Sequence, residues 1–321
     1  MTVYGGIRDD LERVEEQLAS WSRSENPLTA EASRYVLRRK GKRLRPALVL
    51  LTAKLFPGAD GEAVFLAALV ELLHTASLIH DDIVDNADLR RGLESVHSRW
   101  GPNITVLLGD HLYIKSIGLS LRSRHDRITR LLVEVSSRMI EGELEECALA
   151  GNLSVTEAEY LRVAGNKTAA LFAFCCRAGA ILGAAGPDEE ERLAAYGLDL
   201  GMSFQIVDDV LDIVGDEESL GKPVLSDLGE GRITLPFIHA MRMNGRVGPG
   251  RIEGLVGRKD ITAEERRSLL RSLSACGSLD YAMAKAREYS ERSLGSLQSF
   301  PGSPSREALE RLTISILERD R

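Results

Sequence analysis

The sequence predicts an all-α protein, built as one large helical bundle. Ala, Leu, Glu and Arg are abundant, and apolar residues recur at three- and four-residue spacing through most of the chain. Segments with the alternation typical of strands are almost absent. The 321 residues, 44% of them hydrophobic and 28% charged, are enough to bury a sizeable core. We therefore expect a single helical domain over residues 1–321.

The expected helices follow one another with Gly- and Pro-containing breaks between them. The first is an amphipathic, highly charged helix within residues 1–18, which lack the basic and apolar regions of an export signal. A last pair of helices is expected after a Gly-rich connector at residues 243–260. The helical periodicity between them covers Ala30–Leu37, Ala47–Leu55, Glu62–Ile79, Ile128–Cys147, Glu157–Leu182 and Glu189–Ile213.

The two most apolar stretches are expected to be core helices. They cover residues 63–79 and 168–186, and Glu71 and Arg177 interrupt them. A membrane-spanning helix needs about 20 predominantly apolar residues, which neither stretch reaches without a charge. We therefore expect no membrane span.

The net charge and the cysteine content argue against nucleic-acid-binding proteins and disulfide-bonded proteins. The net charge of -7 and a pI near 5.6 argue against nucleic-acid binding, because nothing global would attract phosphate backbones. The four cysteines show no CxxC spacing, and the adjacent Cys175 and Cys176 lie in an apolar helical stretch where packing explains them. Reduced thiols and a cytoplasmic location are the expectation.

An aspartate-rich motif ends the helix predicted at residues 62–79. Asp81 and Asp85 are four residues apart, so on a helix they share one face, and Asp82 is turned aside by about 100°. Carboxylates at the negative end of a helix dipole repel one another and the dipole, and a bound cation would relieve both. Oxygen-only ligands favour Mg²⁺, which proteins commonly hold with one or two carboxylates and substrate phosphates.

The motif recurs near the end of a second long apolar helix. The sequence from Gln205 reads QIVDDVLD, which again places Asp208 and Asp212 four residues apart. One copy could be a solvated helix end. Two copies predict a facing pair of metal-binding walls.

Basic residues near these motifs could bind diphosphate. Arg forks and Lys point charges are the side chains that hold phosphate groups. The candidates are Lys42 and Arg45 in GKRLRP, the Arg90–Arg91 pair after the first motif, Lys167 beside Thr168, and Lys222 and Arg232 after the second motif. With the two acidic motifs they predict a site for two diphosphates.

With these motifs the chain resembles the trans-prenyltransferases, the (all-E) polyprenyl diphosphate synthases, of the long-chain, hexaprenyl- to octaprenyl-like type. The motifs that carry the resemblance are Asp81–Asp85 with Arg90 and Arg91, the segment from Gln205 to Asp212, and GKRLRP at 41–46. The resemblance implies an all-helical fold around a deep central cavity. It also implies condensation of isopentenyl diphosphate onto an allylic diphosphate with three magnesium ions. A homodimer is expected from the same resemblance.

The resemblance assigns each site residue a role. Lys42, Arg45, His74 and Arg91 would bind isopentenyl diphosphate without metal. Arg90, Lys167 and Lys222 would hold the allylic diphosphate, and Thr168 and Gln205 would lie against the developing allylic cation. The magnesium ligands would be Asp81, Asp85 and Asp208 directly, and Asp82 and Asp212 through water or the outer shell.

The chain departs from the resemblance at one position. Where the family usually has Lys in GKxTLP, this chain has Arg232, which keeps the charge and changes the geometry.

Two small residues one turn before Asp81 predict a long product. Ala76 and Ser77 stand where short-chain members of the family carry bulky aromatic residues that close the cavity. Each helical turn is about 5.4 Å, comparable to one isoprene unit, so Leu72, Leu73 and Leu69 would be next along the wall. We expect a long-chain product of the quinone side-chain type, which could associate peripherally with membranes, rather than geranylgeranyl or farnesyl diphosphate.

Three alternative functions fit the sequence less well than a polyprenyl diphosphate synthase. Two ExxH pairs, Glu71–His74 and Glu94–His97, have the spacing of a di-iron bundle, but the second lies in a short irregular span. A class I terpene cyclase would need an aromatic-lined pocket, and only 5% of the residues are aromatic. A non-catalytic partner subunit would be expected to lose one aspartate motif, and this chain keeps both.

Overall fold

A computed structural model describes residues 4–38, 41–58, 61–85, 87–90, 93–215, 224–243 and 252–318. Of the predicted site residues, Arg91 and Lys222 lie outside these ranges, and for Arg90 only the backbone is described. The chain divides into two compact units. Unit 1 comprises Met1–Ser136, Leu171–Gly197 and Ser296–Leu312, and unit 2 comprises Ser137–Ala170, Leu198–Gly295 and Thr313–Arg321.

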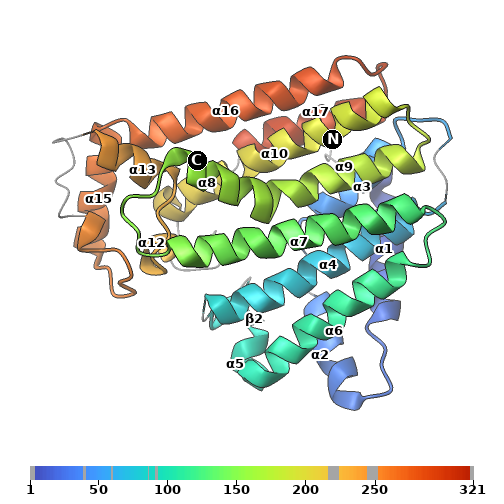
Figure 1. Cartoon of the computed structure of the whole chain (residues 1–321), viewed down its shortest axis with the longest axis horizontal. Helices are drawn as coiled ribbons and strands as arrows, with labels where there is room; N and C mark the ends of the chain where they lie inside the picture. The colour runs from blue at the N-terminus through green and yellow to red at the C-terminus, as the bar shows by residue number, and fades with distance from the viewer. Residues whose placement is uncertain are drawn as a thin grey trace. The chain divides into compact units, whose positions relative to one another are not determined.

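The described residues are overwhelmingly helical, which confirms the predicted all-α class (Figure 1). The elements of the first half are the short 3₁₀ turn η1 (Gly5–Ile7), α1 (Arg8–Trp21), α2 (Pro27–Leu37), α3 (Leu44–Ala53), α4 (Ala63–Val84), β1 (Leu89–Arg90), β2 (Leu93–Glu94), α5 (Val96–Trp100), α6 (Pro102–Ser120) and α7 (Asp126–Leu149). The second half contains α8 (Glu157–Ala164), η2 (Gly165–Ala169), α9 (Ala170–Leu182), α10 (Pro187–Val214), α12 (Ser226–Gly229), α13 (Leu235–Arg242), α15 (Ala263–Ala275), α16 (Ser278–Leu297) and α17 (Pro304–Leu317).

Helix α4 is the central element of unit 1. It packs against α1, α3 and α6, and Figure 1 shows α4 and α6 side by side. The two helices approach closely at Gly109, where a Cβ atom would lie 2.3 Å from Nε2 of His80. Among the described residues, α4 alone has the length and apolarity of a membrane-spanning helix, and 61% of its most apolar window is buried inside the protein. This burial is what the sequence predicted for a core helix.

Unit 2 is organised around the C-terminal half of α10. Met202 of α10 packs with Ala164 and Ala169, and Leu161, Leu198 and Tyr289 cover this cluster. Helix α8 begins with a capping box, in which Thr156 and Glu159 each satisfy the backbone N–H of the other. The helix is thereby fixed at its start, about two turns before the segment that carries Lys167.

The structure differs from the sequence prediction in three places. Helix α6 was not predicted, because it carries apolar side chains on opposite faces, such as buried Leu112 and exposed Ile114, and shows no single apolar stripe. The predicted helix at 157–182 is interrupted by the π-helical segment η2. Three helices within the described residues, α15 to α17, follow the connector that was expected to precede a pair.

Candidate active site

The first aspartate motif occupies the last turn of α4. Asp81 and Asp85 are half-buried, and the backbone N–H of Asp85 donates to the carbonyl of Asp81 over 2.8 Å. Asp82 is 2% exposed, and its carbonyl accepts from the N–H of Ala87. The predicted helix end is confirmed. Because carboxylates at the carbonyl end of a helix are unfavourable alone, this oxygen-only set suits a hard cation.

No group of three or more His, Cys, Asp or Glu side chains in the described ranges is arranged to hold a metal by protein ligands alone. Mg²⁺ commonly keeps several non-protein ligands, among them substrate phosphates, and one or two carboxylates suffice on the protein side. The donor chemistry of the motif therefore fits magnesium bound together with a diphosphate.

The GKRLRP segment leads into α3 and places Arg45 beside His74. Nη1 of Arg45 lies 2.9 Å from Nε2 of His74, and its guanidinium stands 4.9 Å from the centre of the Phe172 ring. Lys42 is exposed. The structure thus brings together two of the residues predicted to bind the same diphosphate, from segments 29 positions apart.

Arg43, which carried no predicted role, anchors this segment. It adopts the left-handed conformation with φ 50°, and its side chain is only 9% exposed. It donates to both carboxylate oxygens of Glu15 and pairs with buried Glu71 on α4. Burial alone would lower the pKa of Arg43, but the two carboxylates raise it above its usual value. Lys42 and Arg45 therefore flank a residue tied to two other helices.

The same contact removes the di-iron alternative. Glu71 is engaged by Arg43, and Glu94 lies in strand β2 whereas His97 lies in the separate short helix α5. The second ExxH pair is therefore not on one helix, as that site would require.

Arg90 lies in the small ribbon that follows the first motif. Strands β1 and β2 are antiparallel, with Arg90 opposite Leu93 and Leu89 opposite Glu94. The ribbon fixes the backbone of Arg90 three residues beyond Ala87, shortly after the aspartate motif.

The predicted chain-length residues lie one turn and more before Asp81. Ala76 is fully buried, and Ser77 is half-buried with its hydroxyl donating to the carbonyl of His74 over 2.9 Å. Leu69, Leu72 and Leu73 are also fully buried in the same helix.

In unit 2, Lys167 and Thr168 lie in the π-helical segment η2. Such segments are rare and occur mostly at functional sites. Gly142 of α7 packs against this segment so closely that a Cβ atom would lie 2.6 Å from the backbone nitrogen of Lys167. Only glycine at 142 permits this approach without a shift of backbone.

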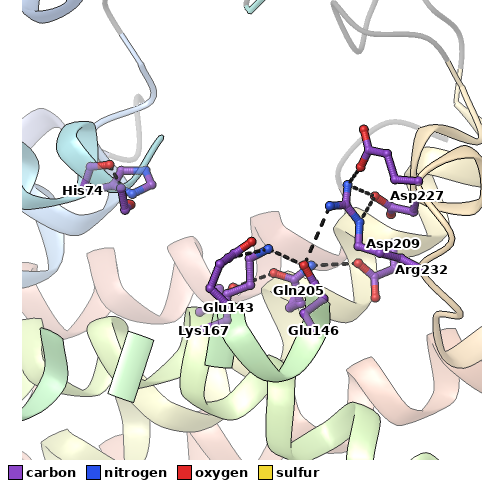
Figure 2. Close-up of polar contacts among 11 residues, drawn as sticks. His74, Glu143, Glu146, Lys167, Gln205, Asp209, Asp227 and Arg232 are labelled. Atoms are coloured by element: carbon purple, nitrogen blue, oxygen red, sulfur yellow. Dashed lines mark hydrogen bonds and ion pairs between the residues drawn. The ribbon is translucent and has the colours of Figure 1, made fainter. Parts of the chain in front are cut away.

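Lys167 projects between two carboxylates of α7, as Figure 2 shows. Its Nζ lies 2.8 Å from Oε2 of Glu143 and 2.5 Å from Oε2 of Glu146. Burial raises the pKa of Glu146, and the nearby charges of Lys167 and Arg232 oppose that rise. The cation predicted to bind diphosphate is thus held by carboxylates in the structure described here.

The three aspartates of the second motif lie in different environments. Asp208 is half-buried, whereas Asp209 is 4% and Asp212 1% exposed. Asp212 accepts from the Ser226 hydroxyl over 2.6 Å and from the backbone N–H of Asp227 over 3.2 Å. Asp212 therefore fixes the start of α12.

Asp209 forms a buried network with Gln205. Gln205 Nε2 donates to Asp209 Oδ1 over 2.7 Å, Tyr160 donates to the other carboxylate oxygen over 2.6 Å, and Thr168 donates to Gln205 Oε1 over 2.7 Å. Burial and the charge of Asp227 raise the pKa of Asp209 well above its usual value, and the donated hydrogen bonds counteract this.

Arg232 is engaged by three carboxylates. Nη2 lies 3.0 Å from Oδ1 of Asp227 and also pairs with Glu230, and Nη1 lies 3.7 Å from Oε2 of Glu146 (Figure 2). A lysine, with a single nitrogen, could not reach all three in this way. The Arg at this position therefore joins the loop after α12 to α7.

Sequence reasoning assigned no role to several residues of these networks. Their patterns were visible only in part: Glu143 and Glu146 share a helix face by their three-residue spacing, and Asp209 is four residues after Gln205. Among them are Arg43, Glu143, Glu146, Tyr160 and Asp209.

Comparisons with known proteins place the chain in a family. The family model described as polyprenyl synthetase matches residues 26–273. The chain belongs to the polyprenyl synthetase family. It is accordingly a prenyltransferase, which sets aside the terpene cyclase and non-catalytic alternatives.

Individual members of the family match over nearly the whole chain. A short chain isoprenyl diphosphate synthase of Methanothermobacter thermautotrophicus is 35% identical over 327 residues, covering 100% of this chain and 99% of its own. The octaprenyl diphosphate synthase of Escherichia coli is 34% identical, covering 97% and 96%. The crystal structure of a polyprenyl synthase from Caulobacter crescentus, complexed with calcium and isoprenyl diphosphate, aligns with a TM-score of 0.94 at 32% identity, covering 99% of this chain and 97% of that one.

The close approach of α7 to η2 gives a first prediction. Gly142→Ala should destabilise the protein by about 1–3 kcal/mol, because the added methyl group overpacks against the backbone of Lys167. Urea unfolding measures the change. Gly295→Ala, at an exposed position of α16 with open space around it, is the matched control and should stabilise by about 0.5–1 kcal/mol. Equal stability of Gly142→Ala and the wild type would contradict the packing described here.

Proposed function

We propose that this prenyltransferase condenses isopentenyl diphosphate onto an allylic diphosphate and repeats the step to make a long-chain all-trans polyprenyl diphosphate, of the type used in quinone side chains. The observation that carries the length is the small size of Ala76 and Ser77 one turn before Asp81. The octaprenyl name of one relative supports it, and the short-chain name of another defines the alternative, a geranylgeranyl or farnesyl product.

The two diphosphates are assigned different residues. Lys42, Arg45, His74 and Arg91 are proposed to bind isopentenyl diphosphate through direct charge-assisted hydrogen bonds. Arg90, Lys167, Lys222 and Arg232 are proposed to bind the allylic diphosphate. Both sets combine Arg forks with Lys point charges, as phosphate sites commonly do.

Magnesium is the proposed cofactor, with three ions expected alongside the bound diphosphate. Asp81, Asp85 and Asp208 are proposed as direct ligands, and Asp82 and Asp212 as supporting carboxylates. When bound, the metal neutralises the negative charge that builds on the departing diphosphate.

The protein side chains supply the rest of the mechanism. As the C1–O bond of the allylic diphosphate breaks, its electron pair leaves with the diphosphate, and Lys167 and the Arg side chains stabilise that charge. Thr168 and Gln205 lie against the allylic cation. The double bond of isopentenyl diphosphate attacks C1, and the proton lost from C2 of the attacking unit passes to the released diphosphate. The reaction needs no protein nucleophile, and it needs a site that excludes water.

The exposed face of α6 supports a homodimer. Leu107, Ile114 and Leu121 are 67%, 68% and 72% exposed and recur every seven residues, and Val106 adds a fourth apolar side chain. Seven residues are close to two helical turns, so these side chains form one stripe. Exposed apolar stripes of this kind mark protein interfaces, and we propose a second copy of this chain as the partner. A cytoplasmic location, with peripheral membrane association through the lipid product, is proposed with it.

Product analysis tests the proposed function. Purified protein with Mg²⁺, isopentenyl diphosphate and farnesyl diphosphate should yield products well beyond geranylgeranyl diphosphate, with lengths read by mass spectrometry. Ala76→Phe and Ser77→Phe should shorten the products by at least one isoprene unit, because a bulky ring would block the wall. Ala76→Ser is the small-residue control. A wild-type product that ends at farnesyl or geranylgeranyl diphosphate would contradict the long-chain proposal, and no condensation would contradict the reaction.

The dimer proposal makes a separate prediction. Replacing Leu107 and Ile114 together by Glu should convert a dimer to a monomer in sedimentation experiments, because two buried charges per subunit would be unpaired. Ile314→Glu, at an apolar residue of α17 that is 46% exposed, is the control and should leave the dimer intact. A wild-type monomer would contradict the proposal.

A further inference from the structure

Four side chains next to η2 form a continuous hydrogen-bonded series, which we call the Asp209 relay. It runs from Tyr160 through Asp209 and Gln205 to Thr168, over successive distances of 2.6, 2.7 and 2.7 Å. Figure 2 shows Gln205 and Asp209 directed toward each other from one side of α10. Only the two residues at one end, Gln205 and Thr168, have a proposed role at the reacting carbon.

Three of the four relay residues are buried, and Gln205 is half-buried. Tyr160 and Thr168 are each 8% exposed and Asp209 is 4% exposed. In such surroundings hydrogen bonds are electrostatically stronger than in water, and successive bonds polarise one another. A charge at one end of the relay can therefore influence the other end.

The hydrogen bonds of the relay converge on Asp209 from both sides: Tyr160 donates from one end, and Thr168 and Gln205 donate in turn from the other. Each carboxylate oxygen accepts one hydrogen, from the Tyr160 hydroxyl and from the Gln205 amide nitrogen. Because Nε2 of Gln205 faces Asp209, Oε1 faces Thr168 and accepts its hydroxyl proton. The lone pairs of Thr168 Oγ1 are then directed away from Gln205.

We propose that Asp209 and Tyr160 are positioning residues for the ionisation step: they fix the Gln205 amide so that Thr168 presents an oxygen lone pair, and not a hydroxyl proton, to the allylic cation. The inference rests on the proposed function. In this step the C1–O bond breaks, both electrons leave with the diphosphate, and no proton moves along the relay. The relay lowers the energy of the positive charge by orienting dipoles in advance.

The adjacent aspartates of the second motif then have separate tasks. On a helix Asp208 and Asp209 project about 100° apart. Asp208 is half-buried and is proposed to bind metal, whereas Asp209 is buried against Tyr160 and Gln205.

Asp209→Asn tests the relay directly. Asn is uncharged, and its N–H₂ group takes one of the two positions that accept hydrogen bonds, so either Tyr160 turns its hydroxyl to accept or Gln205 turns its amide. In both cases Gln205 loses the charged acceptor that fixes its orientation, and a turned amide directs Nε2 toward Thr168 and occupies the Thr168 oxygen as an acceptor. Tyr160→Phe removes one donor without changing volume greatly, and it provides a second, milder variant.

The chain offers a matched control for each variant. Asp199→Asn changes another buried aspartate of α10, which pairs with Arg292 over 2.8 Å. Tyr281→Phe removes another tyrosine–carboxylate hydrogen bond, that of Tyr281 with Glu157 over 2.8 Å. Neither control touches the relay.

The measurement is the binding of two unreactive analogues of geranyl diphosphate, by calorimetry in the presence of Mg²⁺. One analogue carries a tertiary ammonium nitrogen in place of C3, and the other is its uncharged carbon isostere. The wild type should prefer the ammonium analogue. Asp209→Asn should reduce this preference about tenfold and Tyr160→Phe about threefold, since a tenfold change corresponds to 1.4 kcal/mol, close to the lower end of the range for one charge-assisted hydrogen bond.

The ratio of the two affinities separates a charge effect from a structural one. Loss of packing would weaken the binding of both analogues alike and leave the ratio of their affinities unchanged. The two control variants should also leave this ratio unchanged. Thr168→Val should abolish the part of the preference that Asp209→Asn removes, so the double variant should lose no more than Thr168→Val alone.

The inference is overturned if Asp209→Asn and Tyr160→Phe keep the wild-type ratio, or if Asp199→Asn lowers it equally. That failure is distinct from failure of the proposed function. A wild type that condenses the two diphosphates while its ratio is insensitive to Asp209 would refute the relay alone, whereas a wild type without condensation would refute the function.

Discussion

Pairing of partly buried cations with carboxylates is the constraint on which the rest of the structure depends. The chain has a net charge of -7, and the proposed reaction requires concentrated positive charge around two diphosphates. In unit 2, Lys167 lies between Glu143 and Glu146, and Arg232 contacts Glu146 as well as two further carboxylates. An unpaired charge that is partly withdrawn from water is costly, so each pair holds its cation at a defined place before any substrate binds.

Local backbone geometry serves the same purpose. The π-helical segment places Lys167 and Thr168, which are adjacent in sequence, against different partners: Lys167 meets the carboxylates of α7, and Thr168 meets Gln205 of α10. Gly142 allows α7 to approach closely enough for this arrangement. In unit 1, the left-handed backbone at Arg43 and its contacts with Glu15 and Glu71 hold the segment that carries Lys42 and Arg45. Catalytic geometry of this kind is preorganised by residues that need not touch the substrate.

The sequence was informative wherever a signal was periodic or local. Both aspartate motifs were predicted at the ends of long helices, and α4 and α10 end there. Helix α6 was missed because apolar side chains on both of its faces remove the amphipathic signal, and η2 was missed because a π-helical turn has no distinctive composition. The partners of Lys167 and Arg43 were missed for another reason: Glu143 lies 24 positions before Lys167 and Glu15 lies 28 before Arg43, so only the fold brings them together.

The central claim is that the allylic diphosphate is held through metal by the aspartate carboxylates, whereas isopentenyl diphosphate is held by Lys and Arg directly. Calorimetric titration with and without Mg²⁺ tests it, with isopentenyl diphosphate and an unreactive thiolo analogue of geranyl diphosphate as ligands. The account predicts that removing Mg²⁺ lowers the affinity for the allylic analogue about 100-fold and leaves the affinity for isopentenyl diphosphate unchanged. A 100-fold change corresponds to about 2.7 kcal/mol, at 1.36 kcal/mol per tenfold. Equal binding of the allylic analogue in both conditions would contradict it.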